Sequence, residues 1–217
     1  MISLEHVFKF YRIKGYRKIV FNHVSLTLER GSSYAILGIN GAGKSTLMRL
    51  LAGAELPNGG RVRRTARVSW PLGFSGGLHR NMTARENAQF VARAYGEDVR
   101  RVVSFVEDFA EIGHYFDAPV MTYSSGMTQR VAFGLSMAID FDCYLIDEVM
   151  AVGDGRFRER CREEFRIRKS RSDIIMASHS MSAIKQYCDR GVVIAQGQLN
   201  YFSRVDDAIE MYRRLNI

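Results

Sequence analysis

Residues 38–45 (GINGAGKS) constrain the fold of this 217-residue chain more than any other segment. They follow a short apolar run at 33–37 and precede a helical pattern at 45–52. A glycine-rich loop between a buried strand and a helix lets successive backbone N–H groups turn toward an anion. Lys44 is expected to reach the β- and γ-phosphates of a nucleotide, and Ser45 to place its hydroxyl on Mg²⁺. The predicted nucleotide-binding residues of this loop are Gly38, Asn40, Gly41, Ala42, Gly43, Lys44, Ser45 and Thr46.

Two later apolar runs end in polar side chains of the kind that hydrolysis needs. The run at 143–146 is predicted to be a strand that delivers Asp147 and Glu148 at its carboxyl end, beside the nucleotide. Asp147 is expected to hold the metal, and Glu148 to orient and polarise the attacking water. The run at 174–177 leads to His179, which is expected to contact the γ-phosphate. The simpler alternatives are two solvated carboxylates in a loop and a half-buried histidine without a catalytic role.

A second candidate anion site precedes another helical pattern, at Ser124, Ser125 and Gly126. One chain has no use for two γ-phosphate sites on separate parts of its fold. Two copies arranged head to tail do, because each copy can close on the nucleotide of the other. The sequence therefore predicts a homodimer with the nucleotides between the copies.

The order of the hydrophobic patterns predicts an α/β protein. Residues 2–11 and 18–29 alternate apolar and polar side chains, which is typical of half-exposed antiparallel strands. Helical spacing then predominates from 83 to 140, and Thr83 and Glu86 have the form of a capping box that starts a helix near 84. We expect one domain over 1–217, with a core at 1–71 and 141–217 and an inserted helical subdomain at about 72–140.

Taken together, these motifs resemble the nucleotide-binding subunits of ABC transporters. Ser124 and Gly126 match the phosphate-contacting serine and second glycine of the ABC signature, and Asp154 matches the D-loop aspartate. Tyr11 matches the aromatic residue on which adenine stacks, although a lone tyrosine in a strand is more often a packing residue. The resemblance implies a P-loop NTPase (RecA-like) core with an antiparallel β subdomain and an inserted α-helical subdomain, and it implies ATP and Mg²⁺ as cofactors.

Three stretches are similar to the ATP-binding subunits of bacterial capsular-polysaccharide exporters: SWPLGFSGG at 69–77, TYSSGM at 122–127 and IDEVMAVGD at 146–154. O-antigen exporters are next nearest, but many of them carry a further carbohydrate-binding domain, for which a chain ending at Ile217 has no room. The resemblance implies an ATPase that powers export of lipid-linked capsular polysaccharide. It would be peripheral, held at the cytoplasmic face of the bacterial inner membrane by polytopic permease subunits docked near residues 71–82.

The chain departs from the ABC pattern in several places. It has no glutamine between residues 66 and 88, so the usual Q-loop ligand to Mg²⁺ and water is missing. Either another residue of 71–79, with Ser75 as a candidate, replaces it, or the metal relies on Ser45 and Asp147. Less common residues also occur in the signature and after the catalytic glutamate, at Tyr123, Ser125, Met127 and Val149. None of these changes removes a charged catalytic group, so hydrolysis is still expected.

The formal charge of +8 suits an acidic partner such as nucleic acid, anionic lipid or nucleotide phosphates. No nucleic-acid partner is expected, because neither a recognised reader motif nor an aromatic stacking pattern accompanies the arginines. A soluble ABC ATPase that acts on ribosomes or DNA remains the alternative from another class.

The 3 cysteines are odd in number and lack metal-ligand spacing, which favours free thiols in a reducing compartment.

Overall fold

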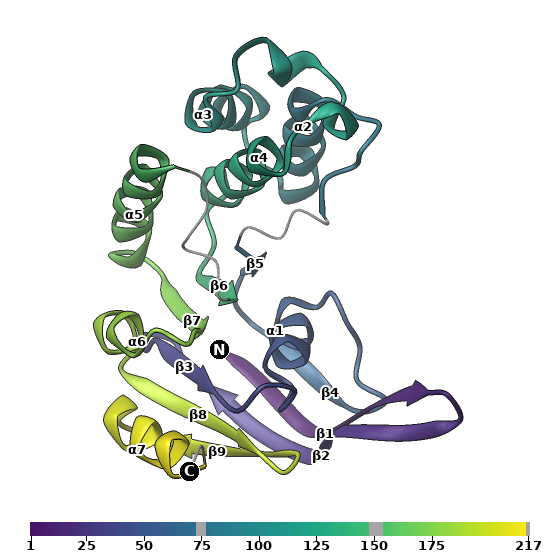
Figure 1. Cartoon of the computed structure of the whole chain (residues 1–217), viewed down its shortest axis with the longest axis vertical. Helices are drawn as coiled ribbons and strands as arrows, with labels where there is room; N and C mark the ends of the chain where they lie inside the picture. The colour runs from purple at the N-terminus through teal and green to yellow at the C-terminus, as the bar shows by residue number, and fades with distance from the viewer. Residues whose placement is uncertain (73–76, 148–153, 216–217) are drawn as a thin grey trace. The chain divides into compact units, whose positions relative to one another are not determined.

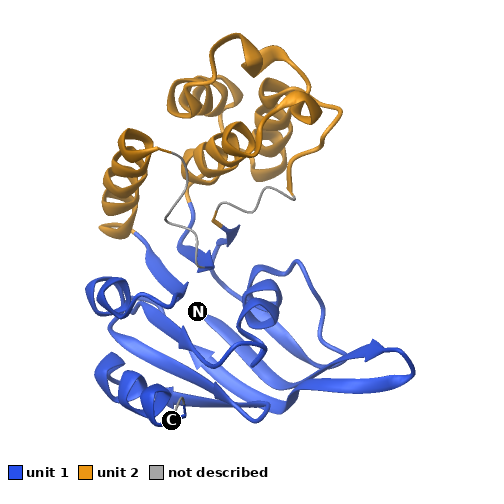
Figure 2. Ribbon diagram, viewed as in Figure 1, with its two compact units in different colours: residues 1–71, 141–148, 172–217 blue, residues 72–140, 149–171 orange. Residues whose placement is uncertain are grey.

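The computed structural model describes residues 1–72, 77–147 and 154–215, and the chain divides into two compact units (Figures 1 and 2). Unit 1 comprises residues 1–71, 141–148 and 172–217, and unit 2 comprises residues 72–140 and 149–171. The sequence-based division has the same breaks after 71 and after 140. It differs at 149–171, which it assigned to the core and which group with the helical unit.

Unit 1 begins with a three-stranded antiparallel sheet in the order β2-β1-β4. Its strands are β1 (Ile2–Ile13), β2 (Tyr16–Leu28) and β4 (Gly59–Arg64). The predicted alternation is present in β1, where Ile2 and Leu4 are buried, and it resumes at Val7 and Lys9 after a shift in the strand register between Leu4 and Val7. One face of this sheet therefore packs on the core of the unit, and the other contacts solvent.

The second sheet of unit 1 has six strands in the order β5-β6-β7-β3-β8-β9. Its strands are β3 (Tyr34–Leu37), β5 (Val68–Pro71), β6 (Cys143–Asp147), β7 (Asp173–Ala177), β8 (Arg190–Ala195) and β9 (Gln198–Phe202). All neighbouring pairs are parallel except β8 and β9, which form an antiparallel hairpin. Helices α1 (Lys44–Ala52), α6 (Met181–Tyr187) and α7 (Val205–Leu215) complete the unit. The α/β class predicted from the sequence is confirmed.

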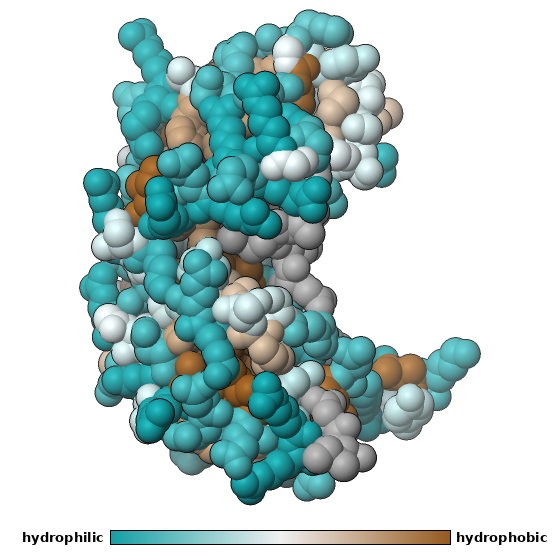
Figure 3. Space-filling view, turned by 60° about the vertical axis from the view of Figure 1, so that its left-hand side comes forward, coloured by the Kyte–Doolittle hydropathy of each residue, from teal (hydrophilic) through white to brown (hydrophobic). Residues whose placement is uncertain are grey.

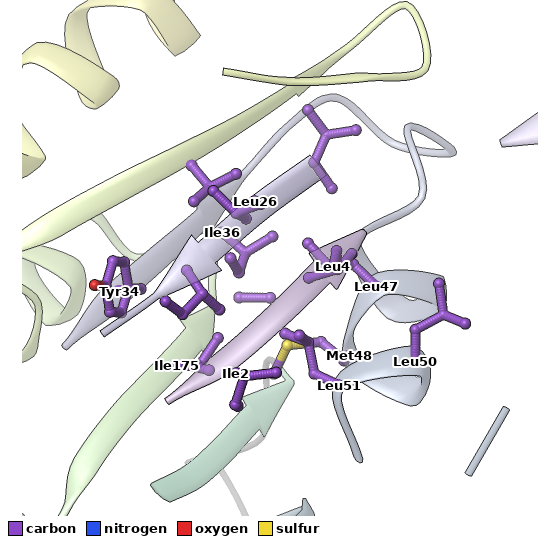
Figure 4. Packing of buried hydrophobic residues seen from close by; sticks show 14 of the residues in the cluster. Ile2, Leu4, Leu26, Tyr34, Ile36, Leu47, Met48, Leu50, Leu51 and Ile175 are labelled. Atoms are coloured by element: carbon purple, nitrogen blue, oxygen red, sulfur yellow. The ribbon is translucent and has the colours of Figure 1, made fainter. Parts of the chain in front are cut away.

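Helix α1 packs its apolar side between the two sheets. Leu47 and Leu51 are fully buried at 0% exposure and belong to the same hydrophobic cluster as Ile2 and Leu4 of β1 and Ile175 of β7. Figure 4 shows the α1 side chains beside those of β1. Burial of a leucine of this kind contributes about 1.5–3 kcal/mol. This packing fixes the helix that follows the glycine-rich loop against both sheets.

Unit 2 is helical in its described residues. It contains α2 (Ala84–Tyr95), α3 (Val99–Ala110), α4 (Ser125–Ala138) and α5 (Gly155–Lys169), with short 3-10 turns at Gly113–Asp117 and Val120–Thr122. The predicted capping box is confirmed, because the Glu86 N–H donates to Thr83 Oγ1 over 3.0 Å and the Thr83 N–H donates to Glu86 Oε2 over 2.9 Å. Ring contacts of Phe109 with Phe133 and Phe157 join α3, α4 and α5, with centroids 5.8 and 5.4 Å apart.

The helices that the structure describes include none that is both long and apolar enough to span a bilayer. Figure 3 shows a face on which hydrophilic side chains predominate and hydrophobic ones form small, separate areas. None of the three cysteines forms a disulfide, as expected, and all three are buried; burial raises the pKa of Cys143 and of Cys161 to about 12. These thiols therefore stay protonated and behave as small apolar side chains.

Candidate functional site

Unit 1 contains a cavity of about 610 Å³ at the end of the glycine-rich loop. The cavity is lined by Tyr11, Arg12, Ile13, Lys18, Val20, Asn40, Gly41, Gly43, Lys44, Ser45, Thr46, Asp147 and His179. Nine of these thirteen residues are candidate site residues from the sequence, and they come from four separate segments of the chain. Gly38 and Ala42 belong to the same loop without lining the cavity.

Two glycines of the loop adopt backbone conformations that other residues rarely reach. Gly41 has φ 79° and Gly43 has φ 114°. A Cβ on Gly43 would lie 2.6 Å from Cγ1 of Val20 and 3.1 Å from the Phe21 ring. Glycine at 43 is thus required both by the turn and by the close approach of strand β2. The loop ends at Gly43, the residue that precedes the first residue of α1.

The ammonium group of Lys44 lies over the loop that precedes it. Its Nζ donates to the carbonyl oxygen of Gly38 over 2.7 Å and to that of Ile39 over 3.3 Å. Lys44 is also the first residue of α1, so its charge adds to the positive end of the helix dipole. This combination of a cation, a helix N-terminus and glycine N–H groups is suited to binding the phosphates of a nucleotide.

Hard oxygen donors of the kind that Mg²⁺ prefers line the same cavity. Ser45 provides an exposed hydroxyl at the start of α1, and Asp147 provides a half-buried carboxylate at the end of β6. No cluster of three or more His, Cys, Asp or Glu side chains able to hold a metal occurs within residues 1–72, 77–147 and 154–215. The pair fits an ion bound by one carboxylate, one hydroxyl and oxygens of the nucleotide and water.

Of the two predicted catalytic residues, the structure describes His179 but not Glu148. His179 follows β7, is exposed and lines the cavity with Lys44 and Asp147. Glu148 lies outside the described residues, as do Ser75 and Val149. The structure therefore brings His179 into the site and leaves the role of Glu148 as a prediction.

The hairpin of β1 and β2 supplies cavity residues that sequence reasoning missed. Tyr11 pairs with Lys18 across the two strands, and Ile13 pairs with Tyr16. Cross-strand partners point to the same face, so Tyr11, Ile13 and Lys18 line one wall of the cavity. Tyr11 was predicted, but Ile13 and Lys18 were not, because the sequence alone does not determine the register of this hairpin.

The second candidate anion site lies in unit 2, at the start of α4. Ser124 caps this helix by accepting a hydrogen bond from the Met127 N–H over 3.2 Å, and Ser125 is the first helical residue. A Cβ on Gly126 would meet only the Ser124 hydroxyl, 3.9 Å away. Among the residues that the structure describes, packing therefore does not require glycine at 126.

Tyr123, which departs from the common signature, has a structural role. Its hydroxyl donates to the carbonyl oxygens of Tyr115 and Ala118 over 2.7 and 3.1 Å, and it accepts from the Ala84 N–H over 3.3 Å. Burial raises the pKa of Tyr123, so the hydroxyl keeps its proton for these bonds. The tyrosine ties the segment before α4 to the start of α2.

Asp154 caps the next helix of unit 2. Its Oδ1 accepts from the Phe157 N–H over 2.9 Å, and its Oδ2 accepts from Arg130 over 2.6 Å. The Phe157 N–H and the Arg130 charge outweigh the opposing effect of burial and lower the pKa of Asp154. The Arg130 guanidinium also lies over the Phe157 ring, 4.5 Å from its centroid. Both carboxylate oxygens of Asp154 are therefore engaged within unit 2.

Comparisons with known proteins agree with this site. A family model described as ABC transporter matches residues 21–151. The capsule polysaccharide export ATP-binding protein CtrD of Neisseria meningitidis serogroup B is 49% identical over 216 residues, covering 99% of this chain and 100% of that protein. The ATP-binding protein BexA of Haemophilus influenzae is 46% identical over 213 residues, covering 98% of each chain.

Among solved structures, a dimeric post-hydrolysis state of the ATP-binding cassette MJ0796 bound to ADP and Pi has the same fold. Its TM-score is 0.74 at 18% identity, and the match covers 94% of this chain and 99% of that one. The family match spans the glycine-rich loop, the signature segment and the strand that ends at Asp147. The chain is a member of the ABC transporter family.

Proposed function

We propose that the chain is the ATP-binding and hydrolysing subunit of an ABC transporter that exports capsular polysaccharide. The observation that carries the proposal is the cavity of unit 1, in which Lys44, Ser45, Asp147 and His179 meet beside Tyr11. The near full-length similarity to CtrD and BexA supports the cargo, because CtrD is named as a capsule polysaccharide export protein.

Each nucleotide would be bound by its phosphates at the loop of residues 38–46 and by its base at Tyr11. Ser45 and Asp147 would hold Mg²⁺, which when bound neutralises the phosphate oxygens and orients the γ-phosphate. His179 would contact that phosphate. Glu148, the residue after the β6 carboxylate, would accept a hydrogen bond from the attacking water and orient it.

A second copy would complete the site. In this arrangement Ser124, Ser125 and Gly126 of the partner subunit bind the γ-phosphate through the N-terminus of α4, and Asp154 stands close to the same interface. The support within one chain is the exposed position of Ser124 and Ser125 and the ordinary contact distance of 3.9 Å that a Cβ at Gly126 would have. Closure of the two copies on ATP and reopening after hydrolysis would supply the movement that drives transport.

Polytopic permease subunits would dock near residues 71–82 and hold the chain at the cytoplasmic face of the bacterial inner membrane. The cargo would be a lipid-linked capsular polysaccharide. The absent Q-loop glutamine means that the signal between permease and nucleotide would pass through other groups of this segment. An O-antigen or another exported substrate is the alternative within the same transporter class, because the ATPase motifs are shared.

The test is to purify the chain with its permease and measure ATP hydrolysis with added glycolipids. Stimulation by lipid-linked capsular polysaccharide and not by a lipid-linked O-antigen supports the proposed cargo, and the reverse result overturns it.

Cell fractionation tests the alternative that the chain is a soluble ABC ATPase acting on ribosomes or DNA. Salt-sensitive recovery with ribosomes or DNA, instead of stable recovery with membranes, would contradict a transport role.

A further inference from the structure

Three charged side chains outside the phosphate loop, those of Lys9, Arg49 and Glu55, form a cluster next to the Tyr11 hydroxyl. The carboxylate of Glu55, which follows α1, accepts hydrogen bonds from the Tyr11 hydroxyl over 2.7 and 2.9 Å. It also accepts from Lys9 over 2.7 Å and from Arg49 over 2.9 Å. The exposed fraction of the Lys9 side chain is only 8% and that of Glu55 is 19%, so water has little access to this pair.

The Tyr11 hydroxyl is the centre of this cluster. It donates to Glu55, accepts from Arg49 Nη2 over 3.0 Å, and lies 3.3 Å from the hydroxyl of Thr46. Thr46 is two residues after Lys44 on α1 and lines the nucleotide cavity. A single hydroxyl thus joins β1, which carries the aromatic ring, to the helix that carries the phosphate-binding lysine.

Electrostatics keep the cluster assembled. Burial would by itself raise the pKa of Glu55, but the hydrogen bonds from Lys9, Arg49 and Tyr11 outweigh it and lower that pKa to about 2. The carboxylate therefore stays charged at neutral pH, and it is flanked by two cations. Lys9 donates as well to the carbonyl oxygen of Leu56 over 2.8 Å, which holds the loop after α1 in place.

The Lys9 ammonium occupies one side of the Tyr11 ring. Lys9 Nζ lies over the ring, 5.3 Å from its centroid, and Lys9 is buried and does not line the cavity. Tyr11 itself does line the cavity. A ring with a fixed hydroxyl and an occupied far side has few other rotamers, so the cost of ordering it is met during folding and not on binding.

We propose that Glu55 is a positioning residue that holds the Tyr11 ring ready for the base of the nucleotide, with Lys9 and Arg49 as its charge partners. The inference rests on the proposed function, since it requires that ATP binds in the cavity of unit 1. Its specific consequence is that Glu55 acts on the base end of the ligand. Binding of the phosphates at Lys44 does not depend on it.

The experiment compares two ligands, ATP and inorganic tripolyphosphate, which lacks the base. Glu55→Gln should raise the Kd for ATP by about 3- to 10-fold, the range expected when one side chain must be ordered on binding. The Kd for tripolyphosphate should stay at the wild-type value. Tyr11→Phe keeps the ring and removes the hydroxyl, so it should reproduce this pattern, and the double variant should add little to either single one.

Glu29→Gln is the matched control, because Glu29 also pairs with an arginine, Arg190, at 2.9 Å, but does not line the cavity. It should bind both ligands as the wild type does. Equal losses of ATP and tripolyphosphate in Glu55→Gln and Tyr11→Phe would overturn the inference in favour of a general structural role, and unchanged ATP binding in both would overturn it outright. A wild-type chain that binds neither ligand would contradict the proposed function instead.

Discussion

The guanidinium of Arg130 donates to the carboxylate of Asp154 over 2.6 Å and joins helix α4 to the start of α5. The same carboxylate caps α5 through the Phe157 N–H. Asp154, which the sequence predicts to be a D-loop aspartate, is therefore positioned by the helix that begins at the predicted signature, within one unit of one chain.

Substitution of Asp154 should separate its two roles. Asp154→Asn keeps a good capping group but removes the negative charge that pairs with Arg130. Asp154→Ala removes both the cap and the charge. Thermal unfolding should therefore show a larger fall in Tm for the alanine variant. The lowered pKa of Asp154 means that its contribution is present above the ordinary aspartate value and is lost as the pH falls below about 4. Equal Tm values for the two variants would show that the cap has no effect.

Gly126→Ala should leave the isolated chain intact and impair the assembled enzyme. A Cβ at this position meets only the Ser124 hydroxyl, 3.9 Å away, so the Tm and the Kd for ATP of the monomer should not change. If the partner subunit's nucleotide approaches this glycine, ATP-dependent dimerisation and hydrolysis should fall. Analytical ultracentrifugation with and without ATP measures the first effect. A variant that dimerises and hydrolyses ATP normally would exclude Gly126 from the interface.

Gly43→Ala should destabilise the fold and weaken nucleotide binding together. The residue has φ 114°, and the added Cβ would lie 2.6 Å from Val20, so we expect a loss of about 1–3 kcal/mol in the free energy of unfolding. Gly41→Ala is the control, since Gly41 has φ 79° but open space around it and should lose less. Urea unfolding followed by fluorescence compares the two. A smaller loss for Gly43→Ala than for Gly41→Ala would contradict the packing argument.

Lys44→Ala and Glu148→Gln should fail at different steps. Lys44→Ala removes the cation over the phosphate loop and should weaken ATP binding itself. Glu148→Gln should bind ATP normally, lower kcat by about 100-fold or more, and accumulate an ATP-bound dimer that size-exclusion chromatography detects. Hydrolysis at the wild-type rate by Glu148→Gln would remove this residue from the mechanism.

Acid should test the Glu55 cluster. The pKa of Glu55 is lowered from 4.5 to about 2, so its carboxylate stabilises the fold above pH 4.5, and this contribution is lost as the pH falls toward 2. The free energy of unfolding of Glu55→Gln should be lower than that of the wild type at neutral pH, and the difference should shrink through this range. Chemical denaturation at a series of pH values provides the measurement. A difference that does not vary with pH would mean that the charge of Glu55 is not what stabilises the cluster.

The parts of the fold that the sequence predicts well are those set by local chemistry. The loop at 38–45 needs glycines because of its backbone angles, and Thr83 and Glu86 cap a helix through neighbouring atoms. Cys143 was expected in a buried strand because its neighbours are apolar, and it lies in β6. Each of these depends on a few adjacent residues, so no knowledge of distant contacts was needed.

What the sequence did not predict depends on contacts between distant segments. Helix α5 buries only Phe157, Cys161 and Phe165, and its other residues are mostly charged. Three apolar residues in the sequence are too few to predict which unit this helix packs in. Glu55 reads as an ordinary loop residue, because its partner Tyr11 is 44 positions away. Lys18 enters the cavity only through the register of the first hairpin.

The parallel pairing of β6, β7 and β3 has one more consequence. Asp147 pairs with Ala177, and Ala177 pairs with Ile36, so a single row of backbone neighbours runs across three strands to the start of the phosphate loop. The distance between the Asp147 carboxylate and that loop is therefore set by the spacing of three adjacent strands. The length of the segment inserted between β5 and β6 therefore does not alter the distance between Asp147 and the loop, because the sheet and not the insertion sets it.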